Sequence, residues 1–291
     1  MPFYLIQAVL VTGWWLLMAL DPAVGAAFAF DGMAVGAFGL FVIPDLVVIV
    51  GSSLVAWRRP GRTVQAILVG AWSYAAAWCI AASWSTRSGY LGTTCMVLAL
   101  LANGFAVWGH TLFARKPVPR FGSFGLETFL QSAVIWMVFL ALLPALLLVE
   151  FGRWPVQLEP WSGAAGFLML GSFSLLGVRS ALALVRDGKG TPLPLAAPNR
   201  LVVSGPYRRV RNPMAIAGLG QGLGVAVMTR SPEVAAYVVV GMIVWNYLVR
   251  PVEEDELRQT FGDDYVNYAK RVRCWIPAFS SPSTPPSGSG H

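Results

Sequence analysis

"YLGTTCMVLALLANGFAVWGHTLFA" covers residues 90–114 and contains no aspartate, glutamate, lysine or arginine. An uncharged run of this length exceeds the ~20 residues that a helix needs to cross a bilayer. Its apolar residues do not alternate with polar ones as in a half-buried strand, and a helix satisfies its backbone hydrogen bonds within one segment. The run therefore predicts a transmembrane helix.

Further runs of comparable length and low charge lie on both sides of this segment. They cover residues 3–20, 33–57, 63–84, 126–149, 161–185, 213–229 and 232–249. Of the 291 residues, 56% are hydrophobic and 12% are charged, whereas a soluble domain carries about 25% charged residues. We therefore predict an all-α, polytopic transmembrane bundle of about eight spans. A cleaved signal peptide is an alternative for the first run, although no basic residue precedes it.

The basic residues between these runs predict an orientation. Each loop that would face outward holds one of them, namely Arg87, Arg153 or Arg230. The opposite loops hold clusters: Arg58, Arg59, Arg62, Arg115, Lys116, Arg120, Arg186, Lys189, Arg200, Arg208, Arg209 and Arg211. The positive-inside rule then places both termini in the cytoplasm, in a bacterial-type plasma membrane. This distribution explains the net charge of +7 without a nucleic-acid partner.

The chain divides into two regions and a tail. Residues 1–120 hold four spans with short connections, and their role is not evident from the sequence. Residues 121–279 hold four more spans and the two long polar segments, 186–212 and 250–275. Residues 280–291, "SSPSTPPSGSGH", are rich in serine, proline and glycine, which predicts a disordered tail.

Several polar residues fall within the predicted spans. Asp45 follows Pro44, and an ionisable residue at this depth favours an alternative in which the chain is a non-enzymatic transporter or scaffold. Asp45 could equally be neutral or paired beside a proline kink. We expect His110 to be structural. The cysteines, Cys79, Cys95 and Cys274, show no paired spacing, so neither a disulfide framework nor a metal site is expected. The glycines of "GLGQGLG" (218–224) predict close helix packing.

The segment "SGPYRRVRNPMAIAG" (204–218) begins with a turn and continues into an apolar run. Asn212 is a suitable N-cap and Pro213 suits the first helical position, so a helix should begin here at the membrane surface. Its free N–H groups, with Arg211 beside them, would attract an anion. A basic anchor for anionic membrane lipids is the alternative. Residues 201–203, just upstream, are predicted to form a short strand-like piece.

A second polar cluster, "EEDE" (253–256), follows the last span directly. It opens an amphipathic helix whose apolar stripe consists of Leu257, Phe261, Tyr265, Tyr268 and Val272. The helix dipole favours Glu253 and Glu254 at this end. The predicted orientation places these carboxylates on the same side as Arg211, Asn212 and Pro213. A ligand with an anionic end and cationic or hydroxyl groups would use both clusters.

These segments, in this order, resemble the integral-membrane methyltransferases related to isoprenylcysteine carboxyl methyltransferase and phospholipid N-methyltransferases. The shared series is Gly-x-Tyr, Arg-(His/Asn)-Pro, Glu-Glu and Phe-Gly-x-x-Tyr-x-x-Tyr, and it covers about residues 160–278. The resemblance implies S-adenosylmethionine as cofactor and a lipid or small hydrophobic acceptor. It implies cofactor contacts by Asn199, Arg200, Leu201, Val202, Tyr207, Arg211, Asn212, Pro213, Met214, Ala215, Glu253 and Glu254.

The resemblance also suggests substrate contacts and shows departures. Arg250 lies one place from an arginine that the carboxyl methyltransferases associate with the substrate, and Arg179 belongs to a looser match. Asn212 stands where those enzymes usually carry histidine, and Ala215 replaces a common tyrosine. Without a histidine in either cluster, the only candidates for a general base are Tyr207, Glu254 and Asp255. A sterol-reductase-like enzyme that uses NADPH is the alternative enzymatic interpretation.

Overall fold

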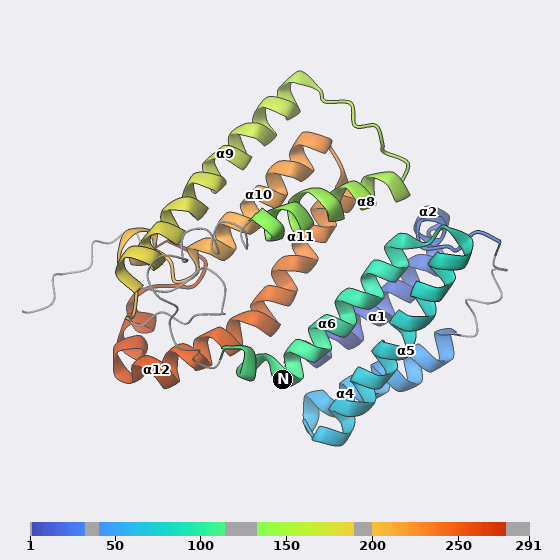
Figure 1. The fold of residues 1–291 in the computed structure, drawn as a ribbon, viewed down its shortest axis with the longest axis horizontal. Coiled ribbons are helices and arrows are strands. Elements are labelled where there is room, and N and C mark those ends of the chain that lie inside the picture. Colours follow the sequence, from blue (N-terminus) through green and yellow to red (C-terminus); the bar gives the residue numbers. More distant parts are fainter. Residues whose placement is uncertain (1, 33–40, 114–132, 189–199, 278–291) are drawn as a thin grey trace, which may run out of the picture.

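The computed structural model describes residues 2–32, 41–113, 133–188 and 200–277, and all regular structure within these ranges is helical (Figure 1). The all-α prediction is confirmed. The elements are α1 (Pro2–Leu20), α2 (Pro22–Ala27), η1 (Asp45–Val50), α4 (Gly51–Arg58), α5 (Arg62–Thr86), α6 (Tyr90–Phe113), η2 (Met137–Leu142), α8 (Leu143–Glu150), α9 (Pro160–Ala183), η3 (Leu184–Gly188), η4 (Gly205–Arg208), α10 (Pro213–Thr229), α11 (Pro232–Val244), η5 (Trp245–Val249) and α12 (Arg250–Arg271).

The helices match the predicted membrane spans closely. In the described part of the chain, 7 helical segments are long and apolar enough to cross a bilayer, and α10 adds a shorter apolar helix of 17 residues. The last of the seven extends from Pro232 to Arg271, with a kink at Gly262. Its charged part, α12, lies beyond the apolar residues 232–249, so we take only the latter as the span. The polytopic bundle is confirmed, and the starts of the predicted runs 33–57 and 126–149 lie outside the described residues.

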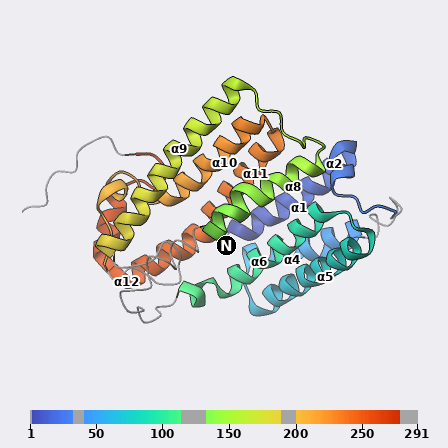
Figure 2. The same ribbon diagram turned by 45° about the horizontal axis from the view of Figure 1, so that its top comes forward.

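The spans form two groups that touch along one side. The helices α1, α4, α5 and α6 lie together, and α9, α10 and α11 form the second group, with α8 in contact with both α6 and α11 (Figures 1 and 2). Leu248 of η5 belongs to the core formed by Phe3, Tyr4 and Trp72 of the first group. Because α12 also contacts α6, the first group reaches the polar end of the second.

Glycines bring α9 and α10 into direct backbone contact. A Cβ on Gly166 would lie 2.6 Å from the carbonyl oxygen of Gly224, and a Cβ on Gly220 would lie 2.3 Å from the ring of Phe173. Gly222 faces Val238 of α11, whereas Gly218 has nothing within 4 Å. The helix-packing interpretation of residues 218–224 is therefore confirmed, since this face of α10 is filled by neighbouring helices.

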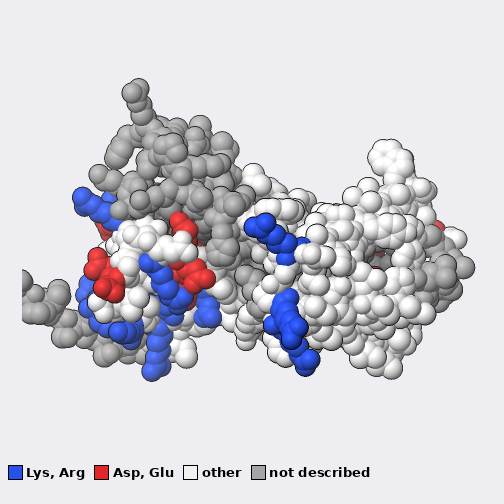
Figure 3. All heavy atoms as spheres, turned by 90° about the horizontal axis from the view of Figure 1, so that it is seen from below, with Lys and Arg blue, Asp and Glu red and all other residues white. Residues whose placement is uncertain are grey.

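Charged side chains gather at one end of the molecule. In the view from below, acidic and basic residues crowd over the end that carries α12, and other basic side chains lie closer to the N-terminal helices (Figure 3). The residues of α12 follow the helix dipole, with Glu253 in the first turn and Lys270 and Arg271 in the last. At the loops predicted to face outward, Arg153 pairs with Glu233 at 2.8 Å.

Candidate functional site

The segment before α10 folds back against α9. Residues 201–203, predicted to be strand-like, have no regular structure, because no strand in the described ranges lies beside them to pair with. The 3₁₀ turn η4 follows, and it begins at Gly205, whose φ of 55° lies in the left-handed region that glycine tolerates best. This turn places Tyr207 against α12, where the hydroxyl of Tyr268 donates a hydrogen bond to the Tyr207 carbonyl at 2.8 Å.

Helix α10 begins where the sequence predicts, with Asn212 as N-cap and Pro213 at the first helical position. The Asn212 side chain does not cap its own helix, however. Its amide group instead donates a hydrogen bond to the sulfur of the buried Cys274 at 3.3 Å. Within the described ranges, no side chain caps the N–H groups of Met214 and Ala215, which lie at the positive end of the helix dipole.

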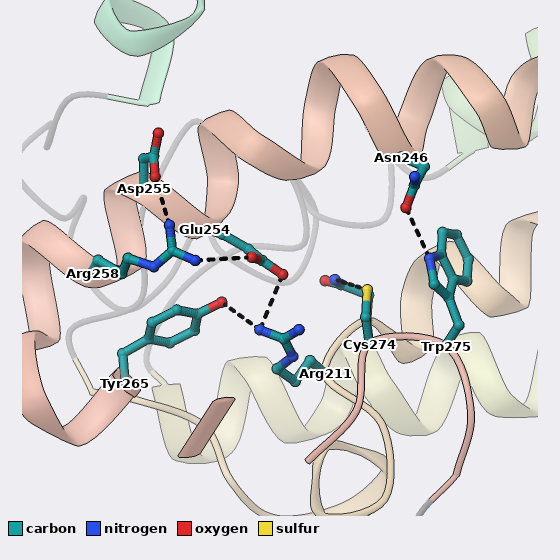
Figure 4. Close-up of polar contacts among 9 residues, drawn as sticks. Arg211, Asn246, Glu254, Asp255, Arg258, Tyr265, Cys274 and Trp275 are labelled. Atoms are coloured by element: carbon teal, nitrogen blue, oxygen red, sulfur yellow. Dashed lines mark hydrogen bonds and ion pairs between the residues drawn. The ribbon is translucent and has the colours of Figure 1, made fainter. Parts of the chain in front are cut away.

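An ion pair joins this helix start to α12 (Figure 4). The Arg211 guanidinium lies 3.1 Å from the Glu254 carboxylate, and the two side chains are only 16% and 11% exposed. Glu254 also contacts Arg258 at 3.4 Å, and Arg258 binds Asp255 at 2.9 Å. The predicted juxtaposition of the two clusters is thus present. Arg211 serves as a link between segments here, because its charge is already neutralised.

The C-terminal segment that follows α12 holds this arrangement from the other side. The carbonyl of Arg273 accepts a hydrogen bond from the Arg211 backbone N–H at 3.0 Å. The indole of Trp275 donates to Asn246 in η5 at 2.9 Å (Figure 4). The start of α10, the end of the last span and residues 272–275 are consequently fastened to one another.

Glu253 differs from its neighbour Glu254. Its carboxyl forms no ion pair or hydrogen bond with any residue that the structure describes. Burial, with a smaller contribution from the adjacent Glu254 carboxylate, raises the pKa of Glu253 to about 7. A partly buried carboxylate that is paired with no cation among the described residues is suited to bind a cationic group of a ligand.

The tyrosines of the site remain protonated at neutral pH. Burial, together with the nearby carboxyl of Glu253, raises the pKa of Tyr207 far above its usual range. Burial, with a further contribution from Glu254, raises the pKa of Tyr265 to about 12. These hydroxyl groups are therefore hydrogen-bond donors, and Tyr207 does not act as a general base near pH 7.

A cavity of about 480 Å³ lies between the segment before η4 and α12. This volume falls within the range of about 300–1,000 Å³ that is usual for small-molecule sites. A break in α12 shapes one wall, since Gly262 adopts φ 52° and ψ −128° within the helix. The lining residues combine apolar and charged side chains: Arg200, Leu201, Val203, Phe261, Asp264, Tyr268 and Arg271.

Comparison with known families assigns the part of the chain that builds these features. Residues 162–264 match the phospholipid methyltransferase family. The chain is also 35% identical over 81 residues to protein-S-isoprenylcysteine O-methyltransferase B of Arabidopsis thaliana, a match that covers 27% of this chain and 40% of that protein. No solved structure matches the chain. The resemblance to membrane methyltransferases is confirmed for this region.

Residues 162–264, which we call the methyltransferase region because they match the phospholipid methyltransferase family, contain most of the predicted cofactor residues. Arg200 and Leu201 line the cavity, whereas Val202 points into the core. Pro213, Met214 and Ala215 form the first turn of α10, close to the Arg211–Glu254 pair. Asn199 lies outside the described residues. The cofactor contacts of these residues stay predictions.

The two predicted substrate residues differ in position. Arg250 begins α12, and its Nε atom is buried without a hydrogen-bond acceptor in the described part of the chain. Arg179 is exposed on α9 and takes no part in the described ion pairs. Arg250 therefore remains the better placed of the two.

The sequence interpretation missed two charged residues that line the cavity, Asp264 and Arg271. A signal for them exists, because Phe261, Asp264, Tyr268 and Arg271 recur at helical spacing. Only the packing of residues 200–203 against α12 shows that this face encloses a cavity.

Proposed function

We propose that the chain transfers a methyl group from S-adenosylmethionine to a lipid or small hydrophobic acceptor at the cytoplasmic face of the membrane. One observation carries this proposal: the segment that matches a methyltransferase family is also the segment that holds the features suited to the cofactor. The region that matches the phospholipid methyltransferase family contains both the free start of α10 and the unpaired, partly buried Glu253. The matched segment spans only two fifths of the plant relative, so the activity is inferred from these local features.

The residues present fit the polar groups of S-adenosylmethionine. The uncapped N–H groups of Met214 and Ala215 suit its carboxylate. Glu253 suits its ammonium and sulfonium charges. In the cavity, Phe261 and Tyr268 offer ring surfaces to the adenine, and the Asp264 carboxylate can accept hydrogen bonds from the ribose hydroxyls.

When bound, the cofactor supplies a methyl group already activated by its sulfonium. The protein must then bind and orient the cofactor and the acceptor, and exclude water from them. These effects contribute a large part of the rate of such a displacement. The tyrosines serve as donors, since Tyr207 and Tyr265 stay protonated. Glu254 and Asp255 are occupied by arginines.

No residue from 200 to 277 is a histidine, Glu254 and Asp255 are paired with arginines, and Glu253 is assigned to the cationic groups of the cofactor. This favours an acceptor that is deprotonated at neutral pH, such as a carboxylate, over a thiol or amine. Arg250 is suited to the anionic acceptor, because its buried Nε lacks a described partner. The family match favours methyl transfer over the NADPH-dependent reductase.

The proposal is tested by calorimetric titration of S-adenosylmethionine into the purified protein in detergent and in nanodiscs. We expect saturable binding to the wild type and a loss of at least about ten-fold in affinity for Glu253→Gln, because a cationic ligand loses its counter-charge. Glu256→Gln, on the same helix, is the matched control and should bind normally. Absence of binding to folded wild-type protein in both environments would contradict the proposal.

A further inference from the structure

The N-terminal helices contain an acidic residue that methyl transfer does not use. Asp45 begins the π-helical segment η1, four residues after the described part of the second span begins, and η1 contacts both α1 and α5. The indole of Trp15 donates a hydrogen bond to one Asp45 oxygen at 3.1 Å. Asp45 forms no ion pair with any described residue, and residues 33–40 include no basic side chain. A carboxylate at membrane depth with one neutral donor still lacks a counter-charge.

Aromatic rings lie on the α1 side of this carboxylate. The ring of Trp15 lies 4.7 Å from that of Trp14, and Trp14 meets Phe28 edge-on at 5.6 Å. The Nε1 atom of Trp14 is buried and has no acceptor within the described ranges. This N–H is therefore a donor that the described protein leaves unsatisfied.

A second aromatic group lies on the α5 side. Phe41 precedes Asp45 by one helical turn, so both lie on the same face of their helix. The Phe41 ring lies 4.4 Å from Trp78 of α5, which meets Phe30 edge-on at 5.6 Å. Trp14, Trp15, Phe41 and Trp78 are all only half-buried. The carboxylate is thus hydrogen-bonded to one set of half-buried rings, and the second set begins one helical turn before it.

We propose that Asp45 and the rings around it form a binding site for an organic cation of the alkylammonium class. Aromatic faces attract such cations through their quadrupole, and quaternary ammonium groups are bound in this way by sets of rings. The Asp45 carboxylate, when ionised beside a bound cation, adds a negative charge. A metal ion fits poorly, because no group of three or more His, Cys, Asp or Glu side chains occurs in the described part of the chain.

The ligand has two potential sources with the same chemistry. It is either a free alkylammonium compound or the headgroup of a choline-type lipid. The predicted orientation puts the site toward the outer face, at the opposite end of the bundle from α12. Binding here is therefore expected to be independent of the cofactor site, and either proposal can fail without the other.

The test measures binding of choline and tetramethylammonium to the full chain, purified in a sugar detergent. We expect saturable binding that Asp45→Asn weakens by about ten-fold or more. Asp31→Asn, an exposed acid on the same side, is the matched control and should bind as the wild type does. Binding of S-adenosylmethionine should be unchanged in Asp45→Asn. Trp78→Leu, which removes a ring and keeps the carboxylate, should also weaken choline binding. This variant replaces Asp45→Asn as the test if Asp45→Asn does not fold.

Nanodiscs distinguish the two sources. If the site takes a lipid headgroup, choline should bind more weakly in phosphatidylcholine nanodiscs than in phosphatidylglycerol nanodiscs, because the lipid competes. Equal binding in both would identify a free cation as the ligand. The proposal is overturned if folded wild type binds neither choline nor tetramethylammonium, or if Asp45→Asn and Trp78→Leu both bind as tightly as wild type.

Discussion

The two groups of helices satisfy their polar side chains in opposite ways. In the N-terminal group, Gln7 donates to Ser53 at 2.8 Å and accepts from Asn103 at 2.6 Å, so neutral side chains join three helices within the apolar core. In the second group, which includes the methyltransferase region, the interacting groups are ions such as Arg211 and Glu254. These ions lie beyond the end of the last span. Membrane depth explains the difference, because neutral groups are far less costly to bury in hydrocarbon than charges.

The packing of the two groups also differs. Large side chains such as Phe3, Leu68 and Trp72 fill the N-terminal core. The α9–α10 pair depends instead on glycines that allow backbone contact, as at Gly166 and Gly224. The methyltransferase region should consequently be the less tolerant of added atoms and of unpaired charge.

The largest effect is expected at the ion pair that joins α10 to α12. Arg211→Met removes the cation from a mostly buried Glu254 and leaves it with the half-exposed Arg258. We expect a loss of about 3 kcal/mol in unfolding free energy, because an unpaired buried charge is costly. Denaturant titration in detergent, followed by circular dichroism, measures this loss.

Arg258→Met is the control for that experiment. The Arg258 side chain is 50% exposed, so its removal should cost less than about 1 kcal/mol. Equal losses for the two variants would show that the Arg211–Glu254 pair has no special structural role.

A smaller effect is expected at the α9–α10 contact. The Cβ of Gly166→Ala would lie 2.6 Å from a backbone oxygen, so the two helices must move apart. Overpacking of this kind costs about 2 kcal/mol. Thermal unfolding should show a lowered midpoint for Gly166→Ala. Gly218→Ala, also in a helix but with open space around it, should be neutral or slightly stabilising; a similar loss there would contradict the close-packing account.

Local sequence patterns predicted most of the fold. Uncharged runs located the spans, and Asn212-Pro213 located the start of α10, because both depend on neighbouring residues alone. The helical spacing of Tyr265 and Tyr268 likewise predicted one stripe, and both are buried. These patterns succeed where a segment's own composition decides its environment.

Partners far apart in sequence could not be predicted. Asn212 fits an N-cap, yet its side chain binds Cys274, 62 positions away. Asp45 had no evident partner, and Trp15 lies 30 positions before it. The cavity beside Asp264 exists only because residues 200–203 pack near α12. Such contacts depend on tertiary packing, which composition and spacing do not encode directly.

The pKa of Glu253 provides a further test of the charged region. In the unliganded protein, the Glu253 carboxyl has a pKa of about 7, and its ionised form is the one that binds a cationic ligand. Affinity for S-adenosylmethionine should therefore rise with pH and level off above pH 7, with about a ten-fold difference between pH 6 and pH 8. Calorimetry across this range should give a steeper profile for the wild type than for Glu253→Gln; parallel profiles would exclude Glu253 as the titrating group.

The same raised pKa has a consequence for stability. The folded state holds the Glu253 proton more tightly than the unfolded chain, in which the pKa of this carboxyl is near its ordinary value of 4.5. The contribution of Glu253 to the stability of the unliganded protein should therefore decrease as pH rises from 4.5 to about 7. Ligand binding should offset this decrease, because the ligand supplies the missing cation.

The smallest effect is expected in the neutral chain of the N-terminal group. Asn103→Leu removes the donor to Gln7 and also removes an acceptor, Asn103 Oδ1, that has no partner among the described residues. Hydrogen bonds between membrane helices contribute about 0.6 kcal/mol on average, so the loss should be well below that of Arg211→Met. Gln7→Leu breaks both contacts of the chain and should cost more than Asn103→Leu. If either variant matched Arg211→Met in the same denaturant titration, neutral hydrogen bonds would stabilise this protein as strongly as its ions do, and membrane depth would not explain how the two groups differ.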